Sequence, residues 1–258
     1  MMNSDGDIET IVKKLLEGPG DVSIVPLGAA VEVAEALAEA ENVSLLSDLM
    51  ERMLPRLTKK ERFDEIETLW IAACTIGAIR RPVMMRTIEK LVGREMVDEA
   101  GELLMMLVDA VIEAEGDEEA LEITTESLAW SKSEGFIACA ARSLENLFGE
   151  VKGFSVILAR FEREAPEEGV EAMERASRAL RFAPGTFLRL SDWTIARVHS
   201  TDGVTAKISH PSGSLEERRV DEKPPPKVLS PAGHEVRALF DTEALSKQWI
   251  DNPGFTGR

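Results

Sequence analysis

The sequence predicts an α+β protein in two parts: a mostly α-helical irregular solenoid or bundle of helical hairpins, then a small SH3-like β-barrel and a short C-terminal helix. Apolar residues recur with a period of about 3.6 residues up to residue 181. Beyond it, short segments alternate between apolar and polar residues and are separated by turn residues. The composition agrees, because Ala, Leu, Met and Glu are abundant whereas aromatic residues make up only 5% of the chain.

The first part is expected to contain about nine helices of 10–20 residues, joined by short turns that hold Gly or Pro. Thr58 and Glu61 have the spacing of a capping box, and Pro82 suits the first turn of a helix. Pro55 is expected just past the end of another helix. The predicted helices cover residues 6–17, 44–54, 58–73, 82–91, 96–115, 117–132, 136–148, 154–164 and 166–180, and residues 27–41 favour a helix by composition.

The arrangement of these helices follows from the length of their connections. Short connections place successive helices antiparallel, so the helices are expected to stack as hairpins. Their starts recur irregularly, about every 15–25 residues, without a tetratricopeptide or ankyrin consensus. Residues 1–181 are therefore assigned to an acidic α-helical hairpin domain, either an irregular solenoid or a compact bundle.

The second part, residues 182–240, is expected to form the small SH3-like barrel. Asp202-Gly203 and Pro211-Ser212-Gly213 supply turns between alternating segments. Strands this short and this close together favour a small barrel. Residues 241–258 are assigned to a C-terminal helix, Thr242 to Ile250, and a tail. The predicted strands cover residues 187–190, 193–199, 204–208, 215–220 and 227–229.

The formal net charge of −17 lies in the helical part. Residues 1–181 hold 37 acidic and 20 basic side chains, whereas residues 182–258 hold ten of each. A field of this sign repels phosphate groups, so we expect no direct nucleic acid binding by the helical domain. The charge either keeps the protein in solution or faces a basic surface on a partner protein.

The sequence predicts neither a catalytic nor a metal site, and no cofactor. Cys74 and Cys139 lie in apolar helical stretches and are interpreted as buried free thiols. The three histidines, His199, His210 and His234, lie in the second part without the spacing of metal ligands. Phosphate loops, dinucleotide fingerprints and nucleophile elbows are absent from the sequence. We therefore expect a protein that is not an enzyme.

The cellular location is predicted from the absence of targeting signals. The first residues lack the basic and apolar regions of a signal peptide. No apolar run approaches the roughly 20 residues that a membrane helix needs. The sequence thus predicts a cytoplasmic protein that does not bind membranes.

One group of side chains in the β part is a candidate for partner binding. Trp193 begins a predicted strand, and Arg189, Arg197 and Lys207 lie on adjacent segments. An aromatic residue with a basic rim suits a protein interface, where Trp and Arg supply much of the binding energy. The alternative is that Trp193 fills the interior of the barrel, and the sequence does not decide between the two.

The β part also resembles a known module. The carrying residues are Phe182-Ala183-Pro184-Gly185-Thr186-Phe187, then Asp192 to Val198, then Asp202-Gly203. They resemble the small module related to the CarD and Mfd interaction domains, whose consensus is Phe-x-Pro-Gly followed by Trp-Gly-x-Gly-x-Val. Thr194 and Ala196 replace the two glycines of that consensus.

In long-form bacterial Gre-type transcription elongation factors, a helical N-terminal extension precedes such a module, and this chain is similar to that extension. The resemblance implies docking onto RNA polymerase, with Trp193 and Arg197 at the matching positions. It implies no transcript cleavage, because the catalytic domain of the family would lie beyond Arg258.

The sequence therefore predicts a non-catalytic protein-binding adaptor, associated with transcription, that docks on RNA polymerase through the β module. The alternative is a helical scaffold or chaperone-like interaction protein without a role in transcription, in which the β module only packs against the helices.

Overall fold

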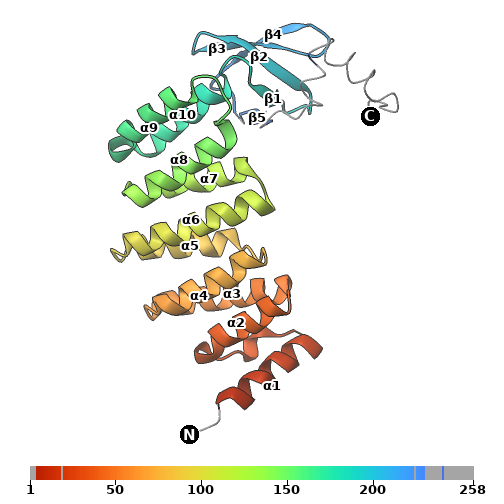
Figure 1. The fold of residues 1–258 in the computed structure, drawn as a ribbon, viewed down its shortest axis with the longest axis vertical. Coiled ribbons are helices and arrows are strands. Elements are labelled where there is room, and N and C mark those ends of the chain that lie inside the picture. Colours follow the sequence, from red (N-terminus) through yellow and green to blue (C-terminus); the bar gives the residue numbers. More distant parts are fainter. Residues whose placement is uncertain (1–3, 19, 224, 230–239, 241–258) are drawn as a thin grey trace, which may run out of the picture. The chain divides into compact units, whose positions relative to one another are not determined.

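The structure is a computed structural model that describes residues 4–18, 20–223, 225–229 and 240 (Figure 1). The chain forms two compact units, residues 1–140 and 141–258, and helix α8 crosses the boundary between them. The predicted combination of many helices with a small antiparallel sheet is confirmed, and the tenth helix ends at Arg181, before the first strand. The predicted C-terminal helix, Thr242 to Ile250, lies outside the described residues.

Ten α-helices lie within the described residues, where about nine were predicted. In this part of the chain, none of the helices is both long enough and apolar enough to cross a membrane. The helices are α1 (Ser4–Glu17), α2 (Ala30–Glu39), α3 (Val43–Lys59), α4 (Phe63–Thr75), α5 (Arg81–Val92), α6 (Val97–Ala114), α7 (Asp117–Ser127), α8 (Glu134–Phe148), α9 (Phe154–Glu168) and α10 (Val170–Arg181), and two short 3-10 helices, η1 (Val22–Ile24) and η2 (Leu27–Ala29), precede α2.

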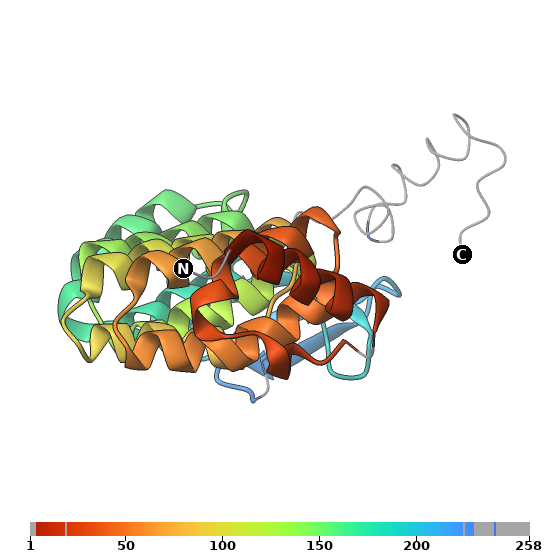
Figure 2. The same cartoon turned by 90° about the horizontal axis from the view of Figure 1, so that it is seen from below.

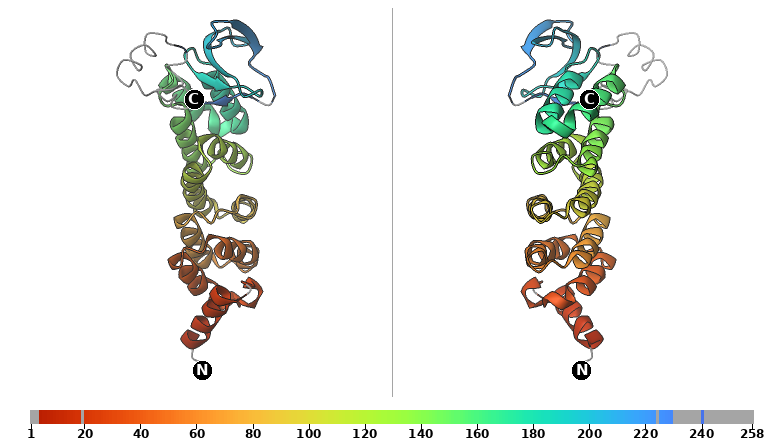
Figure 3. Two further views of the ribbon diagram at one scale, coloured as in Figure 1. Left: turned by 90° about the vertical axis from the view of Figure 1, so that its right-hand side faces the viewer. Right: turned by 90° about the vertical axis from the view of Figure 1, so that its left-hand side faces the viewer.

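The helices of the first unit pack in two layers (Figures 2 and 3). Helices α2, α4 and α6 lie beside one another in one layer, and α3, α5 and α7 lie beside one another in the other. Trp70 of α4 is fully buried in the core of this unit. Its indole nitrogen donates a hydrogen bond of 3.0 Å to the Leu103 carbonyl of α6, the neighbouring helix of the same layer.

Helix α3 runs past the point where the sequence placed its end. Pro55 lies inside the helix, and Thr58 belongs to its last turn, where its hydroxyl donates to the Leu54 carbonyl at 2.6 Å. The predicted capping box at Thr58 is therefore wrong. Leu54 and Leu57 are fully buried, and burying two leucines offsets the cost of about 3 kcal/mol for a proline inside a helix.

The turns that end α3 and α5 are copies of one another, 34 residues apart. Glu61 and Glu95 have left-handed backbone conformations, with φ angles of 58° and 67°. In the first turn the Arg62 amide bonds the Leu57 carbonyl, and in the second the Met96 amide bonds the Leu91 carbonyl, at 3.2 and 3.1 Å. The residues that recur at this spacing are Met50 and Met84, Arg52 and Arg86, Leu57 and Leu91, Glu61 and Glu95, Asp64 and Asp98, Glu65 and Glu99, and Leu69 and Leu103.

This recurrence makes α3–α4 and α5–α6 two copies of one helical hairpin, and 34 residues is a common period of two-helix repeats. Arg94 connects the copies, because its guanidinium bonds the Thr58 carbonyl and lies 3.7 Å from the Glu61 carboxylate. The irregular spacing that the sequence suggested therefore does not hold for these four helices.

The sheet of the second unit has five antiparallel strands in the order β4-β3-β2-β1-β5. Its buried face carries Leu188, Ala196, Val198, Ala206 and Ile208, as the alternation in the sequence predicted. Strands β4 and β5 form the two edges and, within the described residues, do not pair with each other, so a closed barrel is not shown. The strands are β1 (Phe187–Arg189), β2 (Ile195–Thr201), β3 (Thr205–Ser209), β4 (Leu215–Arg219) and β5 (Lys227–Val228).

Candidate protein-binding surface

A tight turn between β1 and β2 presents Trp193 to solvent. The Leu190 amide bonds the Thr194 carbonyl at 2.8 Å, and the Trp193 amide bonds the Leu190 carbonyl at 3.0 Å. The connection is thus a three-residue hairpin loop, in which the third residue adopts a left-handed conformation. Trp193 occupies that position with a φ of 68° and is 73% exposed. The interpretation of Trp193 as a residue of the barrel interior is therefore wrong.

The conformation of Trp193 is strained. A bulky residue at positive φ costs about 1–3 kcal/mol relative to glycine or asparagine, and exposure leaves little burial energy to offset it. The neighbouring Asp192 holds the turn, because its carboxylate accepts hydrogen bonds from the hydroxyl and amide of Thr194 at 2.7 and 3.0 Å. These bonds lower the pKa of Asp192 below its usual value.

Arg189 lies against the indole of Trp193. Its guanidinium carbon lies 4.8 Å from the centroid of the Trp193 ring, which is the geometry of a cation–π contact. Within the described residues, no carboxylate forms an ion pair with Arg189. The turn therefore presents an aromatic ring and an uncompensated positive charge side by side.

A groove of about 440 Å³ adjoins this pair. Its proline wall is held in place by the buried Arg181 of α10, whose guanidinium bonds the Pro226 carbonyl. Arg218 of β4 is neutralised within the groove, because it pairs with Glu216 at 2.9 Å and with Glu222 at 2.8 Å. The lining residues are Arg189, Leu190, Ser191, Trp193, Arg218, Glu222, Pro225, Pro226 and Lys227, and together they are called the Trp193 surface below.

The other two predicted residues lie elsewhere on the sheet. Arg197 stands opposite Phe187 in the β1–β2 pairing, with its guanidinium carbon 5.7 Å from the centroid of that ring. Lys207 of β3 pairs with Glu217 of β4 at 3.5 Å. Neither lines the groove. Of the three basic residues that the sequence grouped with Trp193, the structure brings only Arg189 against it.

Sequence reasoning missed the part of the surface that comes from the far end of the module. Lys227 reaches the site because β5 returns to pair with β1, where Lys227 stands opposite Arg189. Arg218 reaches it from the opposite edge of the sheet. In the sequence, only the run of prolines before β5 indicated an ordered loop. The sequence did not indicate which strand that loop would lie beside.

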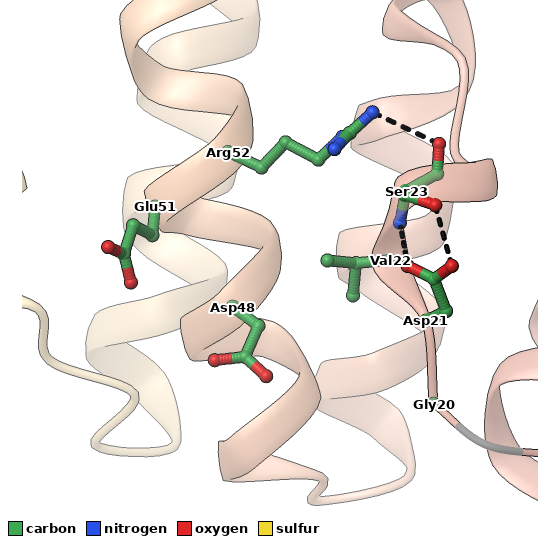
Figure 4. Close-up of a pocket in the computed structure, with 7 residues that line it drawn as sticks. All are labelled: Gly20, Asp21, Val22, Ser23, Asp48, Glu51 and Arg52. Atoms are coloured by element: carbon green, nitrogen blue, oxygen red, sulfur yellow. Dashed lines mark hydrogen bonds between the residues drawn. The ribbon is translucent and has the colours of Figure 1, made fainter.

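The polar groups of a second hollow, beside η1, are largely hydrogen-bonded or ion-paired within the protein (Figure 4). Asp21 accepts hydrogen bonds from the amide and hydroxyl of Ser23 at 2.8 and 2.7 Å, and these lower its pKa. Arg52 donates to the Ser23 carbonyl at 3.1 Å, and Asp48 pairs with Arg80 at 3.1 Å. Its polar groups mostly satisfy one another, so we do not regard it as a separate site.

The remaining chemistry of the described residues is limited. Nowhere in the described part of the chain do three His, Cys, Asp or Glu side chains gather closely enough to hold a metal ion. Both cysteines are free thiols, with Cys139 buried and Cys74 partly so. Burial raises the pKa of Cys74 to about 12, which keeps it in the unreactive protonated form at neutral pH.

Comparison with known proteins adds no relative: no family model, no curated protein and no solved structure matches this chain.

Proposed function

We propose that this protein is a non-catalytic adaptor of the cytoplasm that binds another protein through the Trp193 surface. The observation that carries the proposal is the exposed, strained tryptophan beside Arg189. Asparagine or glycine would occupy the same turn position at lower cost, so the indole there serves something other than stability. Tryptophan and arginine are the residues that most often supply interface hot spots, each contributing about 2 kcal/mol or more.

The shape of the module supports a finer proposal, that its sheet is an SH3-like barrel. Four strands follow one another as a meander and the fifth returns beside the first, an order shared with SH3-like barrels. Arg218 from one edge strand and Lys227 from the other line the same groove. The two edges therefore curl toward each other, as in a partly closed barrel.

We propose RNA polymerase as the partner, on the resemblance to the CarD- and Mfd-related module. The motif residues have structural roles that fit it: Phe182 is buried, and Gly185 has a φ of 97° and bonds the Val198 carbonyl at 2.8 Å. The two departures are also accommodated. Ala196 is buried opposite Leu188, and the Thr194 hydroxyl bonds Asp192 and so fixes the turn.

A second candidate function is a helical scaffold without a role in transcription. The recurring α3–α4 and α5–α6 hairpins favour it, because stacked helical repeats commonly serve as extended binding surfaces. In that case partner binding would depend on the helices and would be indifferent to Trp193.

The test measures binding of the full chain to core RNA polymerase from the source organism, by biolayer interferometry. Trp193→Ala is expected to weaken binding by about 30-fold, the equivalent of a 2 kcal/mol hot spot. Leu215→Ala is the matched control, since it removes another large exposed apolar side chain from the same sheet. We also expect Arg189→Glu to weaken binding more than Lys207→Glu, because Lys207 does not line the groove.

Two results separate the candidates. If polymerase does not bind the unaltered chain, the polymerase proposal fails, and a pull-down from the host with the unaltered and Trp193→Ala chains then decides the adaptor proposal. If partners captured from the host are the same for both chains, the Trp193 surface is not the docking site and the scaffold is favoured.

A further inference from the structure

The layer formed by α3, α5 and α7 carries hollows at repeating positions. The hollow beside η1 is lined on α3 by Asp48, Glu51 and Arg52. The residues 34 positions later, on α5, line a second and larger hollow of about 640 Å³. The larger hollow therefore occupies the same place in the repeat as the smaller one. Those α5 residues are Pro82, Met85 and Arg86.

This second hollow, called the α5–α7 hollow below, differs from the first in having an apolar floor. Met85 and Ile123 are almost fully buried beneath it, and the half-buried Trp130, just after α7, forms part of its wall. Helices α5 and α7 pack much less closely than α3 and α5 do, which leaves room for it. Its volume falls in the range that takes a side chain or a short peptide segment.

Only some of the charged side chains around this hollow form ion pairs within the protein. Arg81 on its rim is already paired, with Glu115 at 3.1 Å and with Glu122 at 3.5 Å. Glu89 and Glu126, the two rim carboxylates, form no ion pair within the described residues. The rim thus offers two carboxylates that form no ion pair among the described residues, together with an indole.

The unit around the hollow favours a cationic ligand as well. Residues 1–140 hold 29 acidic and 13 basic side chains, so almost the whole net charge of the chain lies here. An approaching basic segment is attracted by this field, and an acidic one is repelled. The exposed Arg86 is the one rim cation of the hollow without an ion pair among the described residues, and it does not reverse that balance.

We propose that the α5–α7 hollow binds a basic segment of a partner protein. A Lys or Arg side chain of that segment lies on the Trp130 indole, with its apolar stem over Met85 and Ile123 and its charge facing Glu126 and Glu89. Such a residue uses both properties of the hollow, since its stem is apolar and its head forms cation–π and ionic contacts. This site is independent of the Trp193 surface and stands whether or not polymerase is the partner of that surface.

The test uses two fluorescein-labelled ten-residue peptides, one with four lysines among leucine and serine, and one with glutamate in place of each lysine. Fluorescence anisotropy with the full chain is expected to show binding of the lysine peptide only. A two-dimensional NMR spectrum follows the indole N–H of Trp130, identified with Trp130→Phe. We expect that signal to shift when the lysine peptide is added and to stay in place with the glutamate peptide.

Variants distinguish the hollow from the general acidity of the unit. Trp130→Ala and Glu126→Lys are each expected to weaken binding of the lysine peptide by about fivefold to tenfold. Glu102→Lys changes the net charge equally but lies on the exposed side of α6, in the other layer, and is expected to change binding by less than about twofold. Circular dichroism of each variant verifies that the helices remain folded.

Three results would overturn the proposal. They are equal binding of the two peptides, a Trp130 signal that does not shift when the lysine peptide is added, and an equal loss of peptide affinity in Glu126→Lys and Glu102→Lys.

Discussion

Replacing Glu61 by glycine is expected to stabilise the first unit, although it removes a charged side chain that has an ion partner. Glu61 follows the end of α3 in a left-handed conformation, with a φ of 58°. Its amide bonds the Thr58 carbonyl, and the next amide bonds the Leu57 carbonyl, so the two hydrogen bonds of a Schellman motif fix the backbone. Gly77 occupies the same place after α4, with a φ of 70°, and shows which residue the motif prefers.

The magnitude follows from three contributions. A non-glycine residue in the left-handed region costs about 1–2 kcal/mol, which the glycine releases. The greater freedom of glycine in the unfolded chain takes back about 0.5–1 kcal/mol. The pair between Arg94 and Glu61, 3.7 Å apart and partly exposed, contributes at most about 0.5 kcal/mol after screening. The net stabilisation is roughly 0.5 kcal/mol for Glu61→Gly, and slightly more for Glu95→Gly, which loses no ion pair among the described residues.

Glu102→Gly is the matched control, since it makes the same chemical change at an exposed position inside α6. It is expected to destabilise the unit by about 0.6–1 kcal/mol, because glycine is a poor helix former. Hydrogen exchange of the α3–α6 amides, read by mass spectrometry, gives the local opening free energies without requiring the whole chain to unfold in one step. If Glu61→Gly and Glu102→Gly lowered protection alike, the left-handed strain at Glu61 would not be real and the repeat of the two turns would lose its physical basis.

Three further predictions concern single side chains. Trp70→Ala should cost about 3–5 kcal/mol in urea unfolding, since the ring is fully buried and bonds the Leu103 carbonyl, whereas Trp193→Ala should change stability by less than about 1 kcal/mol. Cys74, with a pKa of about 12, should react with a maleimide at pH 8 far more slowly in the folded chain than in urea, as mass spectrometry can follow. The hydrogen bonds from Thr194 lower the pKa of Asp192, so these bonds hold the turn above the ordinary pKa of Asp and are lost as acid protonates the carboxylate. The Thr194 amide signal in NMR should therefore move at a lower pH than the signals beside an ordinary Asp do.

The strands were predictable because their signals are local. Alternation of apolar and polar residues assigned Ala196 and Val198 to one face, and the turn at Asp202-Gly203 lies where the sequence placed it, with Gly203 at a φ of 88°. The helix ends were less predictable, because a cap competes with burial. Thr58 and Glu61 have the spacing of a capping box, yet the helix continues through Thr58. Burial of Leu54 and Leu57, on either side of Pro55, stabilises the longer helix by more than the cap would.

The repeat was present in the sequence but matched no known consensus. A single matching pair such as Arg52 and Arg86, or Glu61 and Glu95, could arise by chance. Only the spacing of 34 residues that all the pairs share identifies two copies of one hairpin. The candidate surface was predictable only in part for a different reason. Arg189 and Trp193 are close in sequence, whereas Lys227 joins them through the pairing of β5 with β1, which no local pattern encodes.

The same backbone conformation has different meanings at Glu61 and at Trp193. At Glu61, the two hydrogen bonds at the helix end require a residue in the left-handed conformation. The identity of its side chain is not important for this motif. At Trp193 the hairpin loop requires the same conformation, but the residue there is large, apolar, 73% exposed and in contact with Arg189. Glycine at the first position should leave function unchanged and raise stability. Asparagine at the second should also raise stability, because it relieves the strain of the left-handed tryptophan, but it should weaken docking about as much as Trp193→Ala does. If asparagine at position 193 preserved binding, the turn itself and not the indole would be what the partner recognises.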